Sequence, residues 1–167
     1  ISISVVHPLM LQLGWTFQEG EGVIQDNILG SKYLHQVYTA AQKDYTGRVT
    51  VPVLWDKKKN TIVNNESSQI IRMFNSAFND LTGNSDDYYP RALREQIDTI
   101  NEEVYHNINN GVYKTGFATT KEAYEEAFDA LFQTLDTIEK MLTLTNFLVG
   151  NTVTEADWRL FTTLIRF

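Results

Sequence analysis

A proline at the start of a predicted strand is the first feature that could carry chemistry. Residues 49–54 read Val-Thr-Val-Pro-Val-Leu, and the proline removes an N–H that a strand would normally use. A cis bond between Val51 and Pro52 would explain why a proline stands here, because it would turn the preceding backbone outward. The N–H and carbonyl of Val51 could then pair with a peptide-like ligand as an added strand. From the spacing alone, a turn proline without a ligand is an equally good interpretation.

The segment Asn65-Glu66-Ser67-Ser68 is the second candidate, where a predicted strand passes into a predicted helix. Free N–H groups at the start of a helix bind carboxylates, and Glu66 can accept hydrogen bonds from an ammonium group. A ligand that carries both groups on one carbon would satisfy both. Simple helix capping is the commoner role of such a segment and remains the alternative.

Other kinds of site find little support. The three histidines, His7, His35 and His106, lack ligand spacing, so no metal site is expected. The 167 residues contain no cysteine, which excludes a thiolate nucleophile and a disulfide within them. The net charge of −7 argues against nucleic acid and anionic membranes as partners. We expect a soluble, cytoplasmic protein.

The first half of the chain must position the two candidate segments. Residues 1–6 alternate apolar and small polar types and are expected to form a strand. A loop of about 40 residues follows, an uncommon length unless it holds local structure, and 33–38 is a candidate short helix. Residues 49–55 and 61–63 are predicted to form a hairpin. A helix follows it, and its expected buried face consists of Ile70, Phe74, Phe78 and Leu81.

The second half is predicted to be helical. Residues 83–87 form the clearest linker, and Pro90 suits the first turn of a new helix. Apolar residues then recur every three or four positions at Leu93, Ile97, Ile100, Val104 and Ile108, which indicates a helix of about five turns.

Two further helices are expected, each with a capping box. Thr119 and Glu122 would begin the first of them, and Thr154 and Asp157 the second. The expected inward residues of the first are Tyr124, Leu131, Leu135, Ile138 and Leu142. The predicted fold class is thus α/β plus all-α, with domains at 1–82 and 88–167.

Both ends of the sequence resemble interior segments. The chain begins with Ile rather than Met, inside a strand-like pattern, and it ends in an apolar helical stripe without a Gly or Pro stop. We therefore expect an internal piece of a longer protein.

Taken together, six stretches closely resemble the glutathionyl-hydroquinone reductases, the xi-class, omega-like branch of the glutathione transferases. Each stretch alone is a weak signal, but they occur in the family's order over nearly the whole chain. They are Ser4–Pro8, Gly14–Phe17, Gly47–Asp56, Ile62–Ser68, Asn109–Ala118 and Thr154–Phe161.

The resemblance implies a partial thioredoxin-like domain followed by a glutathione transferase-type helical domain. It implies that glutathione, the co-substrate, reduces a glutathionyl-hydroquinone to a hydroquinone, without a metal. Trp15 would line the glutathione site, Glu66 and Ser67 would hold the γ-glutamyl end, and Tyr113 would transfer a proton at the aromatic substrate. The backbone-binding edge would consist of Arg48, Val49, Thr50 and Val51. Without the resemblance, Trp15 would be interpreted as a core aromatic and Tyr113 as a buried tyrosine capping a helix.

One departure from the family is important. Its nucleophile lies in a Cys-Pro-Trp motif upstream of the matching segment, and this sequence contains no cysteine. The tyrosine-bearing helices that follow the matching segment in the family are also absent. We therefore expect these 167 residues to be inactive alone. The alternative function is a non-catalytic glutathione transferase-like module that binds glutathione or a protein. A homodimer is a candidate assembly, whereas the natural quinone is not indicated by the sequence.

Overall fold

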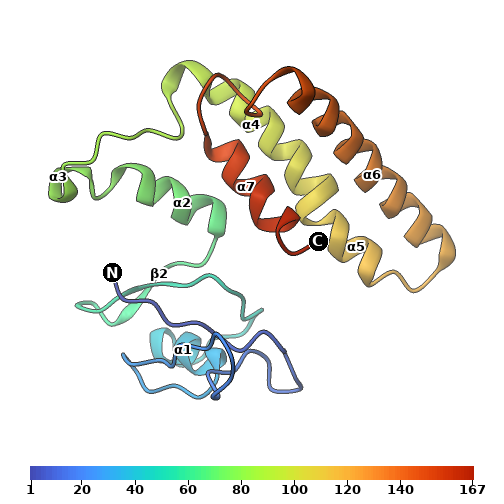
Figure 1. Cartoon of the computed structure of the whole chain (residues 1–167). Coiled ribbons are helices and arrows are strands. Elements are labelled where there is room, and N and C mark those ends of the chain that lie inside the picture. The colour runs from blue at the N-terminus through green and yellow to red at the C-terminus, as the bar shows by residue number, and fades with distance from the viewer. The chain divides into compact units, whose positions relative to one another are not determined.

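The computed structural model describes all 167 residues, which divide into two compact units, Ile1–Phe74 and Asn75–Phe167 (Figure 1). The division falls inside a helix, whereas the sequence predicts a domain boundary at the 83–87 linker. The predicted limits 1–82 and 88–167 remain a prediction, because compactness and domain limits are different properties.

The first unit is built around a small aromatic and aliphatic core. Helix α1 (Leu34–Ala41) confirms the short helix expected at 33–38. Its Leu34, Val37 and Tyr38 pack with Phe17, and Trp15, Val49 and Ile62 are among the partly buried residues around them. Burying this apolar surface stabilises a unit that has little regular secondary structure.

A β-hairpin carries the chain from this core to the next helix. Strands β1 (Leu54–Asp56) and β2 (Thr61–Asn64) are antiparallel, with Trp55 opposite Ile62. The Asp56 carboxylate accepts hydrogen bonds from the N–H groups of Lys58 and Lys59, at 2.8 and 3.0 Å, which closes the turn. The predicted hairpin is confirmed, although its first strand is shorter than the run 49–55.

The strand expected at residues 1–6 is wrong. Only Val5 forms a bridge, to Ile24, and Ile1 and Ile3 are exposed. An alternating pattern is not sufficient for a strand, because a strand also needs a partner along its length. The loop that follows is organised instead by Asp26, whose carboxylate accepts hydrogen bonds from the N–H groups of Ile28, Leu29 and Ser31.

Helix α2 (Ser67–Ser76) begins directly after the hairpin, and the short helix α3 (Asn79–Thr82) follows. The expected buried face is wrong at Phe74, which is 41% exposed, and at Leu81, which is 85% exposed, whereas Ile70 is buried and Phe78 is partly buried. The helical phase is broken before Leu81 because α2 ends at Ser76, and Gly83 closes α3 in a left-handed conformation with φ +68°.

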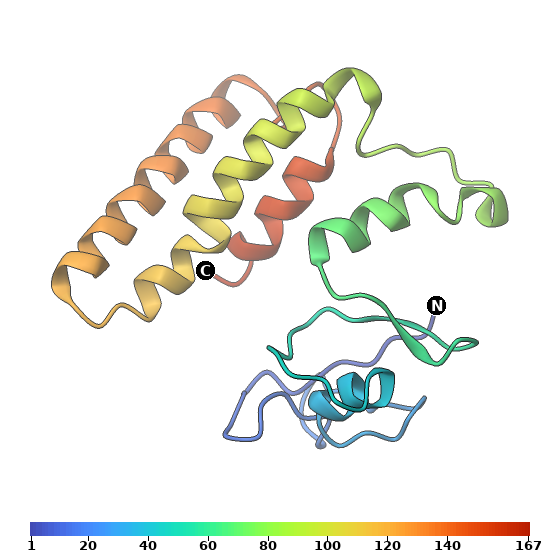
Figure 2. The ribbon, with the colours of Figure 1, turned by 180° about the vertical axis from the view of Figure 1, so that it is seen from behind.

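In the second unit, four consecutive segments form a nearly continuous helix. The single 3₁₀ turn η1 (Arg91–Leu93), which follows Pro90, leads into α4 (Arg94–Glu103). A π-helical segment, η2 (Val104–Asn109), follows, and then α5 (Gly111–Gly116). In Figures 1 and 2, helix α6 (Lys121–Leu144) lies on one side of these segments and α7 (Glu155–Leu164) on the other.

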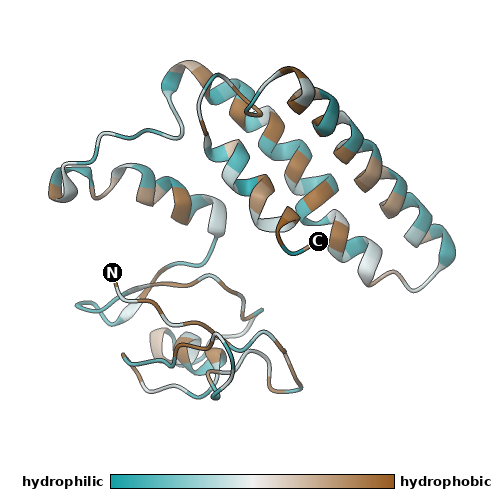
Figure 3. Cartoon of the chain, in the orientation of Figure 1, coloured by the Kyte–Doolittle hydropathy of each residue, from teal (hydrophilic) through white to brown (hydrophobic).

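The core of the second unit lies where these helices meet. It includes Ile97, Val104 and Ile108 from the central helix, Leu131 and Ile138 from α6, and Ala156 and Leu160 from α7. Hydrophobic and hydrophilic residues alternate in bands along α4 and α6 (Figure 3), as expected for helices with one buried face. None of the helices has both the length and the apolar composition needed to cross a bilayer.

Two expectations for α6 are wrong. Its N-cap is Thr120 rather than Thr119, and the Thr120 hydroxyl accepts a hydrogen bond from the N–H of Ala123 at 3.2 Å. Glu122 then lies one residue too early for a capping box with this cap. Tyr124 and Leu142, which were expected to face inward, are both more than 40% exposed, because only the middle of α6 contributes buried residues to the core.

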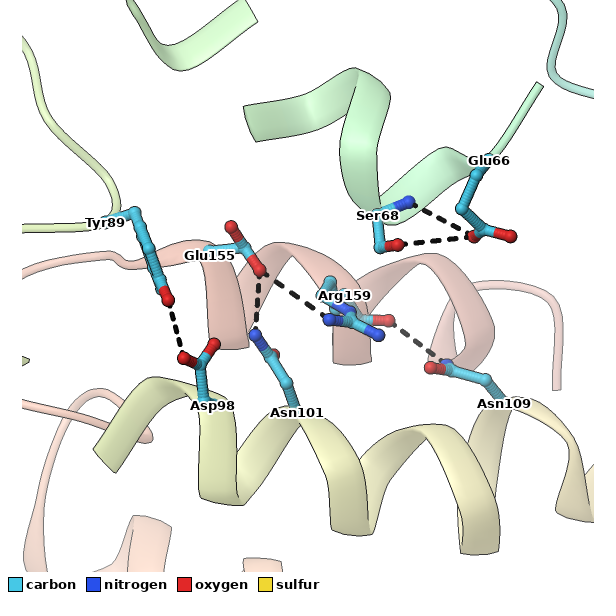
Figure 4. Close-up of polar contacts among 8 residues, drawn as sticks. All are labelled: Glu66, Ser68, Tyr89, Asp98, Asn101, Asn109, Glu155 and Arg159. Carbon is cyan, nitrogen blue, oxygen red and sulfur yellow. Dashed lines mark hydrogen bonds and ion pairs between the residues drawn. The ribbon is translucent and has the colours of Figure 1, made fainter. Parts of the chain in front are cut away.

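The capping box at the start of α7 is confirmed. The Asp157 carboxylate accepts hydrogen bonds from the Thr154 N–H at 2.8 Å and from the Leu148 N–H at 2.9 Å. Nearby, Glu155 accepts a hydrogen bond from Asn101 at 2.8 Å and pairs with Arg159 at 3.6 Å (Figure 4). These contacts tie α7 to α4 and to the segment that precedes it.

Candidate functional site

An open backbone edge lies just before the hairpin. The peptide bond between Val51 and Pro52 is cis, as the sequence suggested it could be. Val51 is 45% exposed, and neither its N–H nor its carbonyl makes a hydrogen bond within the chain. An open donor and acceptor on one exposed residue can pair with the backbone of a peptide-like ligand.

Two residues that precede Val51 are held through their backbone groups by tyrosines. The Tyr38 hydroxyl donates to the Thr50 carbonyl at 2.7 Å, and the Thr50 N–H donates back to the Tyr38 oxygen at 3.3 Å. The Tyr45 hydroxyl donates to the Arg48 carbonyl at 2.7 Å. The Arg48 side chain is exposed, and Val49 packs against the core of the unit. The four predicted edge residues therefore form one anchored segment.

Glu66 and Ser67 stand at the N-terminus of α2, as predicted. Ser67 is the first residue of the helix, and both residues are exposed. The Glu66 carboxylate accepts hydrogen bonds from the Ser68 hydroxyl at 3.3 Å and from the Ser68 N–H at 3.5 Å (Figure 4). Glu66 thus caps the helix through one carboxylate oxygen, Oε1, which accepts both bonds from Ser68. The other oxygen, Oε2, takes no part in these two bonds. That oxygen can accept hydrogen bonds from an ammonium group.

Trp15 is held by backbone pairing on both sides. The Leu34 N–H donates to the Trp15 carbonyl at 2.9 Å, and the N–H of Phe17 donates to the carbonyl of Lys32 at 2.8 Å. Its partly buried side chain packs against the same core as Val49. The indole therefore contributes to the core and retains an exposed part.

Tyr113 belongs to the second unit. It lies on α5 with 55% of its surface exposed, and its ring stacks with Phe117 at a centroid distance of 6.4 Å. This exposure contradicts the alternative interpretation of Tyr113 as a buried structural tyrosine. An exposed phenol is available to exchange a proton with a bound molecule.

The structure collects the seven predicted glutathione-site residues in the first unit, whereas Tyr113 lies in the second. It also adds two residues that the sequence analysis missed, Tyr38 and Tyr45, and joins Asn65 of the second candidate segment to Tyr38 by a hydrogen bond. The available signal was the spacing of Leu34, Val37 and Tyr38, which places a tyrosine on a buried helix face where its hydroxyl needs a partner. No three His, Asp or Glu side chains come together as potential metal ligands.

Comparison with known proteins identifies the family. Sequence models of the glutathione S-transferase N-terminal and C-terminal domains match residues 13–77 and 121–167, respectively. The chain belongs to the glutathione transferase family. The predicted fold class, a partial thioredoxin-like domain followed by a helical domain, is confirmed by these matches and by the solved structures below.

The similar proteins include glutathionyl-hydroquinone reductases and xi-class glutathione transferases. The chain is 58% identical, over 167 residues, to the glutathionyl-hydroquinone reductase PcpF of Sphingobium chlorophenolicum, and covers 53% of that protein. The glutathione-bound structure of YqjG from Escherichia coli matches 98% of this chain with a TM-score of 0.95 and 53% identity. Glutathione transferase Xi 1 from Trametes versicolor matches 98% of it with a TM-score of 0.94 and 53% identity.

The chain spans about half the length of these relatives: 53% of PcpF, 54% of the YqjG structure and 58% of the Trametes structure. These matches cover 98–100% of this chain, so they confirm the resemblance to glutathionyl-hydroquinone reductases that the sequence motifs indicated.

Proposed function

We propose that the chain binds glutathione in its first unit and that the intact protein uses it to reduce glutathionyl-hydroquinones. The observation that carries this is that the exposed Val51 and the helix start bearing Glu66 directly follow Thr50 and Asn65, which both bond to the Tyr38 hydroxyl, in a chain 58% identical to a glutathionyl-hydroquinone reductase. Glutathione is a peptide with a free amino acid end, so it can use both features.

In the proposed reaction the bond between sulfur and the aromatic carbon breaks. The ring carbon keeps the electron pair and takes up a proton, and the hydroquinone leaves. The departing glutathione sulfur ends in a disulfide with a second glutathione, which balances the reduction of the ring. In the family resemblance a cysteine carries the sulfur between these steps, and these 167 residues contain none.

This chain's own residues would bind the tripeptide and transfer one proton. Val51 pairs with its backbone, the α2 N-terminus with Ser67 receives the carboxylate, and Glu66 accepts from the ammonium. Trp15 contributes an aromatic wall. Tyr113 exchanges the proton at the aromatic carbon, for which an exposed phenol is suited.

A cytoplasmic location is part of the proposal, because the reaction consumes reduced glutathione and the cytosolic pool is kept reducing. A homodimer remains a proposal as well, and sedimentation of the chain would test it.

Calorimetry of glutathione binding to the chain, with two Glu66 variants, tests the binding step. Glu66→Gln keeps an oxygen that can cap α2 but removes the charge, and Glu66→Ala removes both. A hydrogen bond to a charged group contributes about 1.5–3 kcal/mol, so Glu66→Ala should weaken affinity about 10- to 150-fold. Glu66→Gln should show most of that loss, and Glu21→Ala, which removes an exposed loop carboxylate, should show none.

Equal affinities in all four proteins would leave Glu66 with capping alone and contradict its proposed role. The reductase activity requires a separate assay on the intact protein with a glutathionyl-hydroquinone. Glutathione binding without turnover there would favour the alternative function, a non-catalytic binding module.

A further inference from the structure

The Tyr38 hydroxyl joins three separate segments of the first unit. It donates to the carbonyl of Thr50 at 2.7 Å and accepts from the N–H of Thr50 at 3.3 Å. It also accepts from the side-chain amide of Asn65 at 3.1 Å. The segments that meet at this oxygen are α1, the backbone edge at 48–51 and the approach to the α2 N-terminus.

The hydrogen-bonding capacity of this hydroxyl is fully used. It donates one hydrogen bond and accepts two, and the Thr50 hydroxyl is a fourth neighbour at 3.5 Å. Tyr38 is 2% exposed, and its ring packs against Tyr45 at a centroid distance of 4.9 Å. The packed, buried ring holds the hydroxyl in place, so the hydroxyl acts as a fixed point for the backbone around it.

This fixed point determines which backbone groups are open to a ligand. Both backbone polar groups of Thr50 are occupied by Tyr38, whereas both of those of the next residue, Val51, are unoccupied. If the Tyr38 hydroxyl were absent, the Thr50 groups would have to find other partners and the segment could shift. The Val51 donor and acceptor would then no longer be presented in one orientation.

We propose that Tyr38 is a positioning residue for glutathione: it holds Thr50 and Asn65 so that the Val51 edge and the start of α2 have the correct spacing for one tripeptide. This inference rests on the proposed function. Tyr45 assists, because its hydroxyl holds the carbonyl of Arg48 at 2.7 Å, two residues earlier on the same edge. Pre-organisation of this kind lowers the entropy that a ligand must overcome on binding.

The test compares Tyr38→Phe with a matched control in the other unit. Tyr38→Phe keeps the buried ring and removes only the hydroxyl. Tyr89→Phe also removes a tyrosine hydroxyl hydrogen bond, the one to Asp98 at 2.6 Å (Figure 4), but leaves the edge untouched. Glutathione affinity is measured by calorimetry for both variants and wild type, together with the free energy of unfolding, so that affinity is expressed per folded molecule.

We expect Tyr38→Phe to bind glutathione about tenfold more weakly per folded molecule, and Tyr89→Phe to bind like wild type. A purely structural role would lower the free energy of unfolding of Tyr38→Phe and leave its affinity per folded molecule unchanged. That result would overturn the inference. Absence of binding by wild type is a different outcome, which would refute the proposed function and the inference with it.

A second variant keeps the test decisive if Tyr38→Phe does not fold. Tyr45 is only partly buried, so Tyr45→Phe can lose its hydroxyl with less effect on the core. It should weaken glutathione binding about threefold, and glutathione should protect the Val51 amide from hydrogen exchange less in this variant than in wild type. Wild-type affinity and wild-type protection in Tyr45→Phe would overturn the inference.

Discussion

Replacing Asp157 with alanine should destabilise the protein through two buried N–H groups. The carboxylate accepts from Leu148 and Thr154, which are 6% and 1% exposed. In Asp157→Ala both donors lose their acceptor. Leaving a buried donor unsatisfied costs about 1–3 kcal/mol, which gives roughly 2–6 kcal/mol for two.

Two effects reduce this figure. Water can reach the vacated space and satisfy part of the loss, and alanine has a higher helix propensity than aspartate by up to about 0.7 kcal/mol. We therefore expect a loss of about 3 kcal/mol in the free energy of unfolding. For a chain of this size each kcal/mol shifts the midpoint of thermal unfolding by about 2–4 °C, so the midpoint should fall by roughly 6–12 °C.

Denaturant titration followed by circular dichroism measures the change. Asp157→Asn keeps one oxygen acceptor and should lose about half as much. Asp129→Ala, at an exposed position inside α6, removes a carboxylate that caps no helix. Its free energy of unfolding should stay within about 0.5 kcal/mol of the wild-type value. A loss in Asp157→Ala no larger than in Asp129→Ala would refute the reasoning. Weaker glutathione binding per folded molecule would instead make Asp157 a site residue.

Three other perturbations give defined expectations. If the intact protein has the proposed reductase activity, Tyr113→Phe should slow hydroquinone release about 10²- to 10⁴-fold without changing glutathione affinity, and Tyr124→Phe should leave the rate unchanged. Equal single-turnover rates in Tyr113→Phe and wild type would remove Tyr113 from the proposed mechanism. Burial acts to raise the pKa of Asp26, but hydrogen bonds from Leu29, Ser31 and Ile28 outweigh it and hold the pKa below its ordinary value. The ionised carboxylate therefore stabilises the fold above pH 3.8, the ordinary pKa, and this contribution disappears as the pH falls through the lower pKa of the folded state. The free energy of unfolding of Asp26→Asn should therefore fall less between pH 7 and pH 2 than that of wild type. An equal fall in the two proteins would contradict this. Finally, the 167-residue chain should not turn over a glutathionyl-hydroquinone above the rate with glutathione alone, because it has no sulfur nucleophile; turnover above that rate would refute the assigned mechanism.

Local patterns predicted much of this fold. The hairpin follows from two β-rich runs around a turn, and the start of α7 follows from Thr154 and Asp157 at capping-box spacing. Each of these depends on residues close together in the sequence. The expected strand at 1–6 is wrong because its partner had to come from elsewhere in the chain, and only Val5 has one.

The site was predictable to a similar extent. The resemblance indicated Glu66, Ser67 and the edge at 48–51, and the structure places all of them in one unit. Tyr38 was missed because its hydrogen bonds reach residues 12 and 27 positions away. No spacing rule connects such positions, although a tyrosine on a buried helix face always raises the question of what its hydroxyl contacts.

The π-helical segment at 104–109 sets the direction in which α5 faces. A π turn contains one residue more than an α turn, and one residue corresponds to a rotation of roughly 100° about the axis. Asn109, at the end of this segment, donates to the carbonyl of Arg159 and the hydroxyl of Thr163 on α7. If the same residues were wound as regular α-helix instead, everything downstream would be turned by that angle. Tyr113 would then face another direction although the sequence is unchanged, whereas deleting one residue from this segment would replace the π turn with an α turn and leave the direction of Tyr113 the same.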